Sequence, residues 1–149
     1  MARPTTIVGS NVYVALETAT PGTYARPCGL TSHTITFTKS TTDVTVPDCD
    51  DLEAPAWIER GVESLEMSGS GNGILAMEAE QTWWDAFEST ESVNARIYLG
   101  APSSAGTVYY AGKIHVTSYE PTGERGGKAQ ATISFVSDGE MTRTVVAGP

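Results

Sequence analysis

Alternation of apolar and polar residues with a period of two limits what this chain can fold into more than any other feature. Residues 11–17 (NVYVALE) and 128–137 (KAQATISFVS) show it most clearly. Successive side chains of a β-strand point to opposite faces, so such runs predict strands with one buried face. Thr and Ser supply 33 of the 149 residues, and β-branched Thr suits a half-exposed strand. The sequence predicts a mainly β protein.

Further runs extend this prediction to the whole chain. Strands are expected over residues 34–38, with a continuation through Val44 and Val46, and over residues 62–68, 95–99, 109–119 and 141–146. Residues 68–73 (SGSGNG) are interpreted as a flexible exit from a strand. The period then changes to three and four over residues 74–89, which predicts one helix with Trp83, Trp84 and Phe87 mainly in the core. We expect one domain, residues 1–149, built as a β-sandwich or barrel with one packed α-helix.

A long acidic connection joins two of the expected strands. Residues 39–61 lack clear periodicity at their centre and are predicted to form a long inter-strand loop. Connections of this length are uncommon inside compact domains and are usually functional or ordered by a partner. The loop is therefore expected to contact another molecule.

Charge is divided unevenly along the chain. Residues 43–91 carry 13 carboxylates and one base, a net charge of −12, whereas the remainder has 8 bases and 5 acids, a net of +3. Two electrically unlike surfaces favour a head-to-tail contact between identical subunits. The alternative is a solvated acidic face that maintains solubility. The acidic balance argues against a protein that binds nucleic acid by neutralising phosphates.

No catalytic or cofactor site is recognisable in the sequence. Gly69, Gly71 and Gly73 lack the βαβ context of a phosphate loop, and Glu78 and Glu80 in the first turns of the following helix would repel an anion. Asp48, Asp50 and Asp51 are only partly similar to a calcium loop, because Leu52 interrupts the pattern and no Gly supplies the bend. His33 and His115 have no Cys or His at ligand spacing. Cys28 and Cys49 are expected to be free thiols, and no apolar run predicts a membrane span or a signal peptide.

Trp57 is the one large aromatic residue within the expected loop. It either folds back on its own core or anchors a contact with a neighbour, since Trp buries much surface at low entropic cost. The sequence leaves both interpretations open.

The order of features resembles a known family. The chain has a Thr-rich strand, the acidic connection KSTTDVTVPDCDDLEAPAWIERGVESLEMSGSGNG (residues 39–73), one helix, and the hairpin strand TGERGGKAQATISFVS (residues 122–137). This order is similar to that of the major tail tube proteins of long, non-contractile-tailed bacteriophages and of phage-like gene transfer agents. The resemblance covers nearly the whole chain and rests on patterns rather than on a signature motif.

The resemblance implies a structural, catalytically inert virion protein without a cofactor. Its subunits would form six-membered rings that stack into a hollow tail tube, assembled in the host cytoplasm, in which a long loop reaches the adjoining ring. The implied partners are the chain itself, the tape-measure protein, tail terminator and distal tail proteins, and DNA that passes without specific binding, with no membrane. The expected contact residues are Asp43, Asp48, Asp50, Asp51, Glu53, Trp57, Arg60, Arg125 and Lys128, with Arg143 as another possible basic partner. The expected lining of the lumen is Thr34, Thr36 and Thr38, or Gln130, Thr132 and Ser134.

Three alternatives to this function stay open. In a monomeric carbohydrate-binding or adhesion β-sandwich, Trp57, Tyr109 and Tyr110 would stack on a ligand. Another virion part, such as a tail terminator or head-tail connector, is a second structural alternative. An enzyme is the third and most distant.

Overall fold

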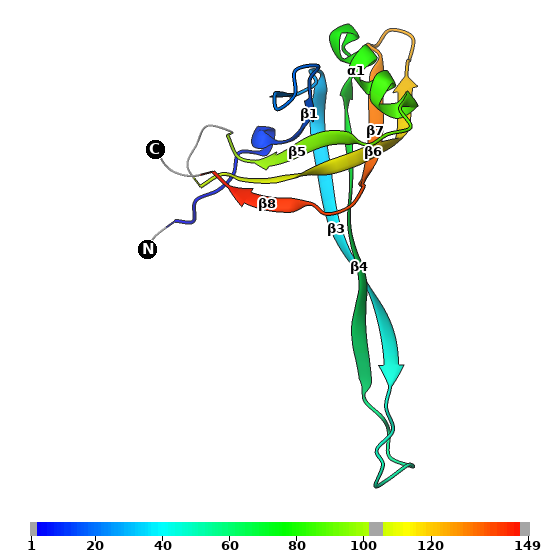
Figure 1. Ribbon diagram of the computed structural model, residues 1–149. Helices are drawn as coiled ribbons and strands as arrows, with labels where there is room; N and C mark the ends of the chain where they lie inside the picture. The colour runs from blue at the N-terminus through cyan, green and yellow to red at the C-terminus, as the bar shows by residue number, and fades with distance from the viewer. Residues whose placement is uncertain (1–2, 102–105, 147–149) are drawn as a thin grey trace.

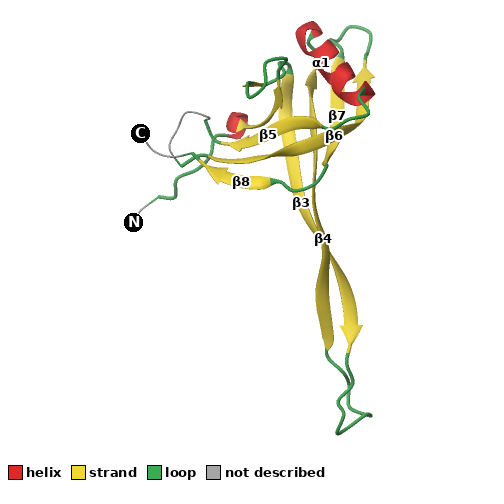
Figure 2. Cartoon of the chain, in the orientation of Figure 1, coloured by secondary structure: helices red, strands yellow, loops and turns green. Residues whose placement is uncertain are grey.

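The computed structural model describes residues 3–101 and 106–146 and consists of a curled sheet, one helix and a long projecting hairpin (Figures 1 and 2). In chain order the elements are a short 3-10 turn (Gly9–Asn11), β1 (Val12–Glu17), β2 (Tyr24–Ala25), β3 (Leu30–Thr45), β4 (Ile58–Ile74), α1 (Met77–Glu88), β5 (Val93–Leu99), β6 (Val108–Thr122), β7 (Gln130–Ser137) and β8 (Thr142–Val145). The predicted mainly β class with one packed helix is confirmed.

All strands belong to one antiparallel sheet in the order β2-β1-β5-β6-β7-β4-β3. β8 pairs with the first residues of β6, 108–111. β6 connects the two halves, because its first half pairs with β5 and its second half pairs with β7. The sheet curls so strongly that β1 approaches β3, although the two strands are far apart in the sheet order. One sheet therefore supplies both layers around the core.

The core lies inside this curled sheet and beneath α1. Its largest fully buried side chains come from β1, β4, β5, β6, β7 and α1, namely Val14, Met67, Ile97, Ile114, Ile133, Phe135 and Trp83. The alternation in β7 behaves as predicted, since Ala131, Ile133 and Phe135 are buried on one face. β1 differs, because Tyr13 and Ala15 are buried as well, beneath the segment that contains β2.

The expected loop over residues 39–61 is mostly a hairpin. β3 continues to Thr45 and β4 begins at Ile58, with paired residues along both strands, so only residues 46–57 form a loop. The expected continuation of the first of these strands through Val44 is confirmed as far as Thr45, whereas the start of β4, residues 58–61, was not predicted because its residues show no clear alternation. We call residues 39–65 the arm and residues 46–57 its tip; Figure 1 shows the arm projecting from the body of the molecule.

The interpretation of residues 68–73 as a flexible strand exit is wrong. These residues form the inner part of β4, with β3 on one side and β7 on the other. A side chain at position 69 would meet the Phe135 ring at 2.7 Å and the Thr34 carbonyl oxygen at 2.8 Å. Glycine is therefore needed because neighbouring groups pack directly against the backbone.

The helix is slightly shorter than predicted, and its core face is narrower. α1 buries Ala79, Trp83 and Ala86 against the sheet, whereas Trp84 and Phe87 lie partly exposed on its outer side. Placing all three aromatic residues in the core was therefore wrong for the last two. Consecutive helical residues are separated by about 100°, so Trp83 and Trp84 cannot both face the sheet.

Candidate functional site

The two sets of residues expected to line a lumen lie on one continuous face of the sheet. Cross-strand neighbours share a face, and the register aligns Thr34 with Ser70 of β4, Ser134 of β7 and Ser118 of β6. The next row aligns Ser32, Asn72, Thr132 and Glu120 in the same way. We call this surface of β6, β7, β4 and β3 the polar face. The sequence offered the two sets as alternatives, and the register brings them together.

Few charges lie on the polar face. Most of its side chains carry hydroxyl or amide groups, with Glu120 opposite Thr132 and Glu66 opposite Thr38. The row of Thr36 and Ser68 also contains Val136 and His115, and Ile74 lies beside Gln130. The opposite face of the same strands carries the buried Ala131, Ile133 and Phe135. The polar face is therefore the side of the sheet that points away from the molecule's own core.

Two edges of this four-stranded region are without a strand partner in the described part of the chain. β3 pairs only through its β4 side, and β6 has no partner on its β5 side beyond Ile114. Such edges present unpaired N–H and C=O groups that can pair with another chain. Because β6, β7, β4 and β3 alternate in direction, the two free edges run antiparallel to each other.

The arm carries an unexpected apolar face. Val62 and Leu65 are three positions apart, so regular alternation would place them on opposite faces. A register shift between Ser40 and Thr41 pairs Leu65 with Lys39 and Val62 with Thr41, which puts both apolar residues on the face of Phe37. This face continues the core face of the body, yet Val62 and Leu65 are exposed. Together with Met141, the arm lines a groove of about 870 Å³ where it leaves the body.

The tip brings together most of the acidic residues expected at a contact. Asp48, Asp50, Asp51 and Glu53 are all exposed there. Two of the carboxylates form local turns, because the Asp50 N–H donates to Asp48 Oδ1 at 2.9 Å and the Glu53 N–H donates to Asp51 Oδ1 at 3.2 Å. Among the described residues, no three His, Cys, Asp or Glu side chains converge as metal ligands would. Trp57 is 90% exposed, so it does not fold back on its own core.

The basic residues expected to meet these acids lie at the other end of the molecule. Arg125 and Lys128 are in the exposed β6–β7 turn (residues 123–129), which follows the pairing of Thr122 with Gln130. Gln130 also pairs with Ile74 at the end of β4 opposite the arm. Figure 1 shows α1 and this turn at the top and the tip at the bottom. Arg143 lies elsewhere, on β8.

Asp43 and Arg60 pair with each other within one chain. They are register partners in the arm, and Arg60 Nε donates to Asp43 Oδ1 at 3.0 Å. Both side chains are more than half exposed, so the pair contributes little to stability. The pair reduces the negative charge of the arm next to the tip.

A cluster of tyrosines and arginines lies under the segment that contains β2. Sequence reasoning did not find this cluster. Tyr13 stacks on Tyr98 with ring centroids 5.3 Å apart, and the Arg96 guanidinium lies 4.2 Å from the Tyr24 ring centre. Burial and the neighbouring Tyr98 raise the pKa of Tyr13. Tyr109 belongs to this cluster, whereas Tyr110 packs on Phe37 with ring centroids 4.7 Å apart. The aromatic residues proposed for ligand stacking are therefore dispersed.

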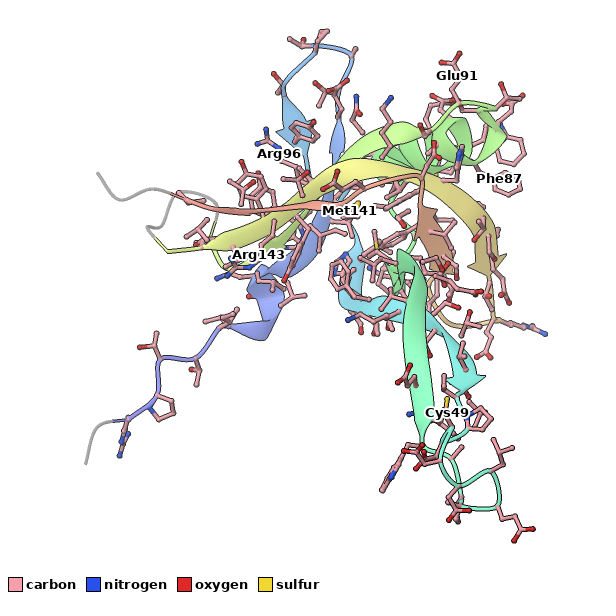
Figure 3. The ribbon with its side chains drawn as sticks, turned by 60° about the horizontal axis from the view of Figure 1, so that its bottom comes forward. Cys49, Phe87, Glu91, Arg96, Met141 and Arg143 are labelled. Carbon is pink, nitrogen blue, oxygen red and sulfur yellow. The ribbon has the colours of Figure 1, made fainter. Side chains whose placement is uncertain are left out.

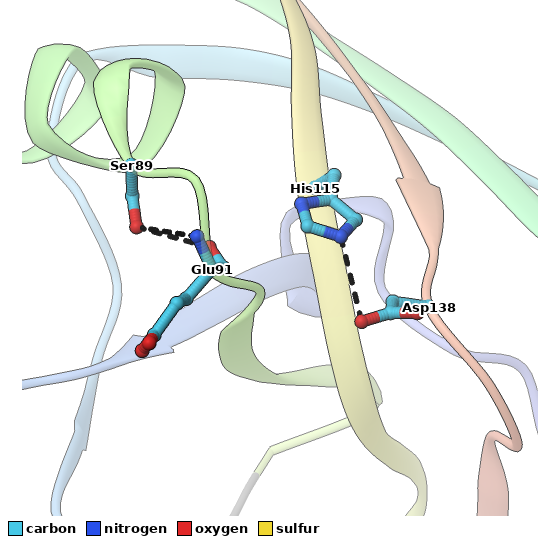
Figure 4. A network of polar contacts seen from close by, with 4 residues as sticks. All are labelled: Ser89, Glu91, His115 and Asp138. Atoms are coloured by element: carbon cyan, nitrogen blue, oxygen red, sulfur yellow. Dashed lines mark hydrogen bonds and ion pairs between the residues drawn. The ribbon is translucent and has the colours of Figure 1, made fainter.

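The two histidines have different surroundings. His115 Nε2 lies 3.4 Å from Asp138 Oδ2, and a separate turn joins Ser89 to Glu91 (Figure 4). Burial, followed by the charge of Arg26, lowers the pKa of His33. Cys28 and Cys49 are free and exposed. Within residues 3–101 and 106–146, no helix is long and apolar enough to cross a membrane.

Comparisons with known proteins agree with this arrangement. The family model described as phage tail tube protein matches residues 6–143. The tail of an empty gene transfer agent (GTA) particle, determined with C6 symmetry, is similar with a TM-score of 0.74 and 21% identity, covering 92% of this chain and 98% of that chain. The SPP1 tail tube is similar with a TM-score of 0.65 and 13% identity, covering 95% of this chain and 81% of that chain.

A chain of the baseplate of the anti-feeding prophage also matches, with a TM-score of 0.62 and 12% identity over 97% of both chains. A comparison with curated protein sequences found no match. At these identities the solved structures support the fold, while the family model covers most of the chain. The chain belongs to the phage tail tube protein family, and its role is that of a structural subunit of a virion tail.

Proposed function

We propose that this chain forms rings of six subunits, as the C6-symmetric tail structure does, and that the rings stack into a hollow tube. The β3 edge of each subunit pairs with the free β6 edge of the next subunit around the ring. The free edges run antiparallel within one subunit, and rotation about an axis along the strands preserves their directions. Each junction then continues the antiparallel order of the sheet.

The observation that carries this proposal is the polar face bounded by two free edges. A contact between two different edges, repeated around a rotation axis, closes a ring and removes both edges from solvent. Four strands from each of six subunits give a barrel of 24 strands. Barrels of 16–18 strands already leave an aqueous channel, so the polar face would line an open bore.

The composition of the polar face suits a conduit. Its hydroxyl and amide side chains hydrate well, and Glu120 and Glu66 repeat around the ring. Carboxylates repel phosphates, and no basic side chain lies on the two register rows that define this face. We propose that the bore holds a tape-measure protein during assembly and later passes DNA without specific binding. Tail terminator and distal tail proteins would contact the two ends of the tube.

The proposed role requires no catalysis, and we propose that the whole chain, residues 1–149, acts as one tail-tube domain without a bound cofactor. The test is electron microscopy of the purified protein and of native particles, combined with light scattering. We expect six-membered rings and tubes, with the chain present in tails. A protein that stays monomeric at all concentrations and is absent from particles would refute the proposal.

A further inference from the structure

We propose that residues 3–8 of one subunit, which we call the N-terminal segment, dock in the groove at the base of the arm of its neighbour in the same ring. Ile7 and Val8 supply the apolar part of this contact. The inference rests on the proposed function, because it adds a second contact to the junction between the β3 edge and the free β6 edge.

The N-terminal segment is an extended stretch without a partner in its own chain. It precedes the 3-10 turn, and all six of its residues are exposed. Ile7 is 55% exposed and Val8 is 63% exposed. Among the described residues, no backbone–backbone hydrogen bond involves residues 3–7. Residues 5–8 (TTIV) are all β-branched and favour an extended backbone. The segment is therefore suited to lie along another surface.

The groove is an apolar surface that its own chain leaves uncovered. Its apolar lining comes from both arm strands and from the residue before β8, namely Phe37, Val62, Leu65, Met67 and Met141. The groove holds about 870 Å³, and Val62 and Leu65 are exposed in it. Figures 1 and 3 show the N-terminal segment of the same chain projecting away from the arm and from Met141. A second copy of the chain is therefore the source of a segment that fills the groove.

The N-terminal segment and the groove lie on the two sides of the same proposed junction. The segment leaves the body beside β3, because Arg26 Nη1 donates to the Ser10 carbonyl oxygen at 3.0 Å, and after burial the charge of Arg26 is the second cause that lowers the pKa of His33 on β3. Ser137 of the groove pairs with Ile114, beyond which β6 has its free edge. Pairing of β3 with the neighbour's β6 therefore brings the segment next to the neighbour's groove.

The N-terminal segment is long enough to make this contact. From His33, β3 runs toward the arm, and the groove begins at Phe37, four residues further on. Four strand residues span about 13 Å, and Ser137 lies on the second strand beyond the junction, about 10 Å across the sheet. Six extended residues reach about 20 Å, which covers both displacements together. In Figure 1 the segment runs sideways from the body toward the level at which the arm begins.

Charge favours the same contact to a smaller extent. The groove is lined by one base, Lys39, and by three carboxylates, those of Glu63, Glu66 and Glu140. Arg143, two residues after Met141, is a second base close to the groove. The N-terminal segment carries one base, Arg3, and no acid. The excess of carboxylates thus helps to orient the segment, while apolar area supplies most of the affinity.

The first experiment removes the apolar side chains of the N-terminal segment. Ile7→Ser combined with Val8→Ser should raise the protein concentration needed for rings about tenfold or more, because two aliphatic side chains lose their burial. Leu52→Ser combined with Met77→Ser is the matched control, since it removes two other exposed apolar side chains. Sedimentation and electron microscopy measure ring formation, and urea unfolding should show unchanged stability. Equal losses in the variant and the control would overturn the inference.

The second experiment tests whether the N-terminal segment and the groove meet. Leu65→Ser should weaken ring formation in the same direction as the segment variant. Combining the two variants should cost less than the sum of the separate losses, because residues in contact are not independent. Strictly additive losses would show that the two surfaces do not meet.

Crosslinking identifies which subunit receives the N-terminal segment. The background variant replaces both exposed thiols, Cys28→Ser and Cys49→Ser. In this background, Thr6→Cys with Glu140→Cys should give, in isolated rings, a ladder of disulfide-linked chains that ends at six. The control places the second thiol in the β6–β7 turn, as Thr6→Cys with Gly123→Cys, and should remain uncrosslinked.

The outcomes separate this inference from the proposed function. A disulfide within a single chain would show that the N-terminal segment folds back on its own groove, and a ladder found only in tubes would place the contact between rings. Either result, or rings without crosslinks, overturns the inference while the ring proposal stands. A wild-type protein that never forms rings would refute the proposed function, and the inference with it.

Discussion

The two ends of the same hairpin have opposite environments. Met67 is completely buried, whereas Leu65, two positions away on the same face of β4, is 71% exposed. Met67 belongs to the core formed by α1 and the curled sheet, whereas among the described residues no second layer covers the arm. The comparison shows that an apolar strand face is buried by its own chain only where another element of that chain covers it.

Adjacent tryptophans on α1 give the largest test of this contrast. Trp83→Ala should lower the free energy of unfolding by about 3–5 kcal/mol, because it leaves a cavity in the core. Trp84→Ala should change it by less than about 1 kcal/mol, because the side chain is partly solvated. Urea unfolding followed by circular dichroism measures both. Similar losses for the two variants would show that α1 packs differently.

β4 has a closely packed glycine in the body, Gly69, and a glycine with open space around it in the arm, Gly61. Gly69→Ala should destabilise the fold by about 1–3 kcal/mol, since the new methyl group meets Phe135. Gly61→Ala lies in open space and should change the stability by about 0.5 kcal/mol or less. The measurement is again urea unfolding. A neutral Gly69→Ala variant would imply that β4 is less tightly enclosed than described.

Removing the tip separates folding from assembly. Deletion of residues 47–55 should change the free energy of unfolding by less than about 1 kcal/mol, because loop length affects stability weakly. The same deletion should abolish stacking, which sedimentation and electron microscopy detect. Unfolding of the shortened protein would place the tip within the cooperative core.

The smallest expected effect concerns pH and the body alone. Burial lowers the pKa of His33 in the folded state, whereas the unfolded chain takes up a proton near its ordinary value of about 6.5. Below about pH 6.5 the unfolded chain therefore binds a proton that the folded protein resists, so the free energy of unfolding falls as the pH drops; above about pH 6.5 this loss is absent. His33→Gln should reduce the difference in unfolding free energy between pH 5.5 and 7.5. An unchanged difference would contradict this assignment.

Sequence reasoning succeeded where local pattern and burial coincide. The alternation of residues 128–137 predicted β7 and its buried face, and the three- and four-residue period predicted α1 to within three residues at each end. It failed where the spacing of apolar residues does not correspond to which residues are buried, as in the arm. The strand predicted through Val44 is present, but the first residues of β4 lack a clear alternation and were not predicted, and the register shift at Ser40 and Thr41 places Val62 and Leu65 on one face despite their spacing.

The candidate surfaces show the same division. Sequence reasoning predicted that the tip acids, Trp57 and the two basic residues of the β6–β7 turn make contacts, which stays a prediction, but it could not place them at opposite ends of one sheet. It named both sets of polar strand residues without showing that they share a face. The pairing of Asp43 with Arg60 and the exposure of Trp84 and Phe87 also depend on the three-dimensional arrangement.

Local chemistry along the chain determined the strands, the helix and the division of charge, because each depends on residues close in sequence. The order of strands, the continuous polar face, the free edges and the unburied arm were decided by tertiary structure. These features depend on contacts between segments many residues apart, such as β4 with β7, and no local periodicity specifies which segments meet. Distant strands pair to form the sheet, and α1 and the curled sheet cover only part of it. The residues that they leave uncovered are available to another subunit.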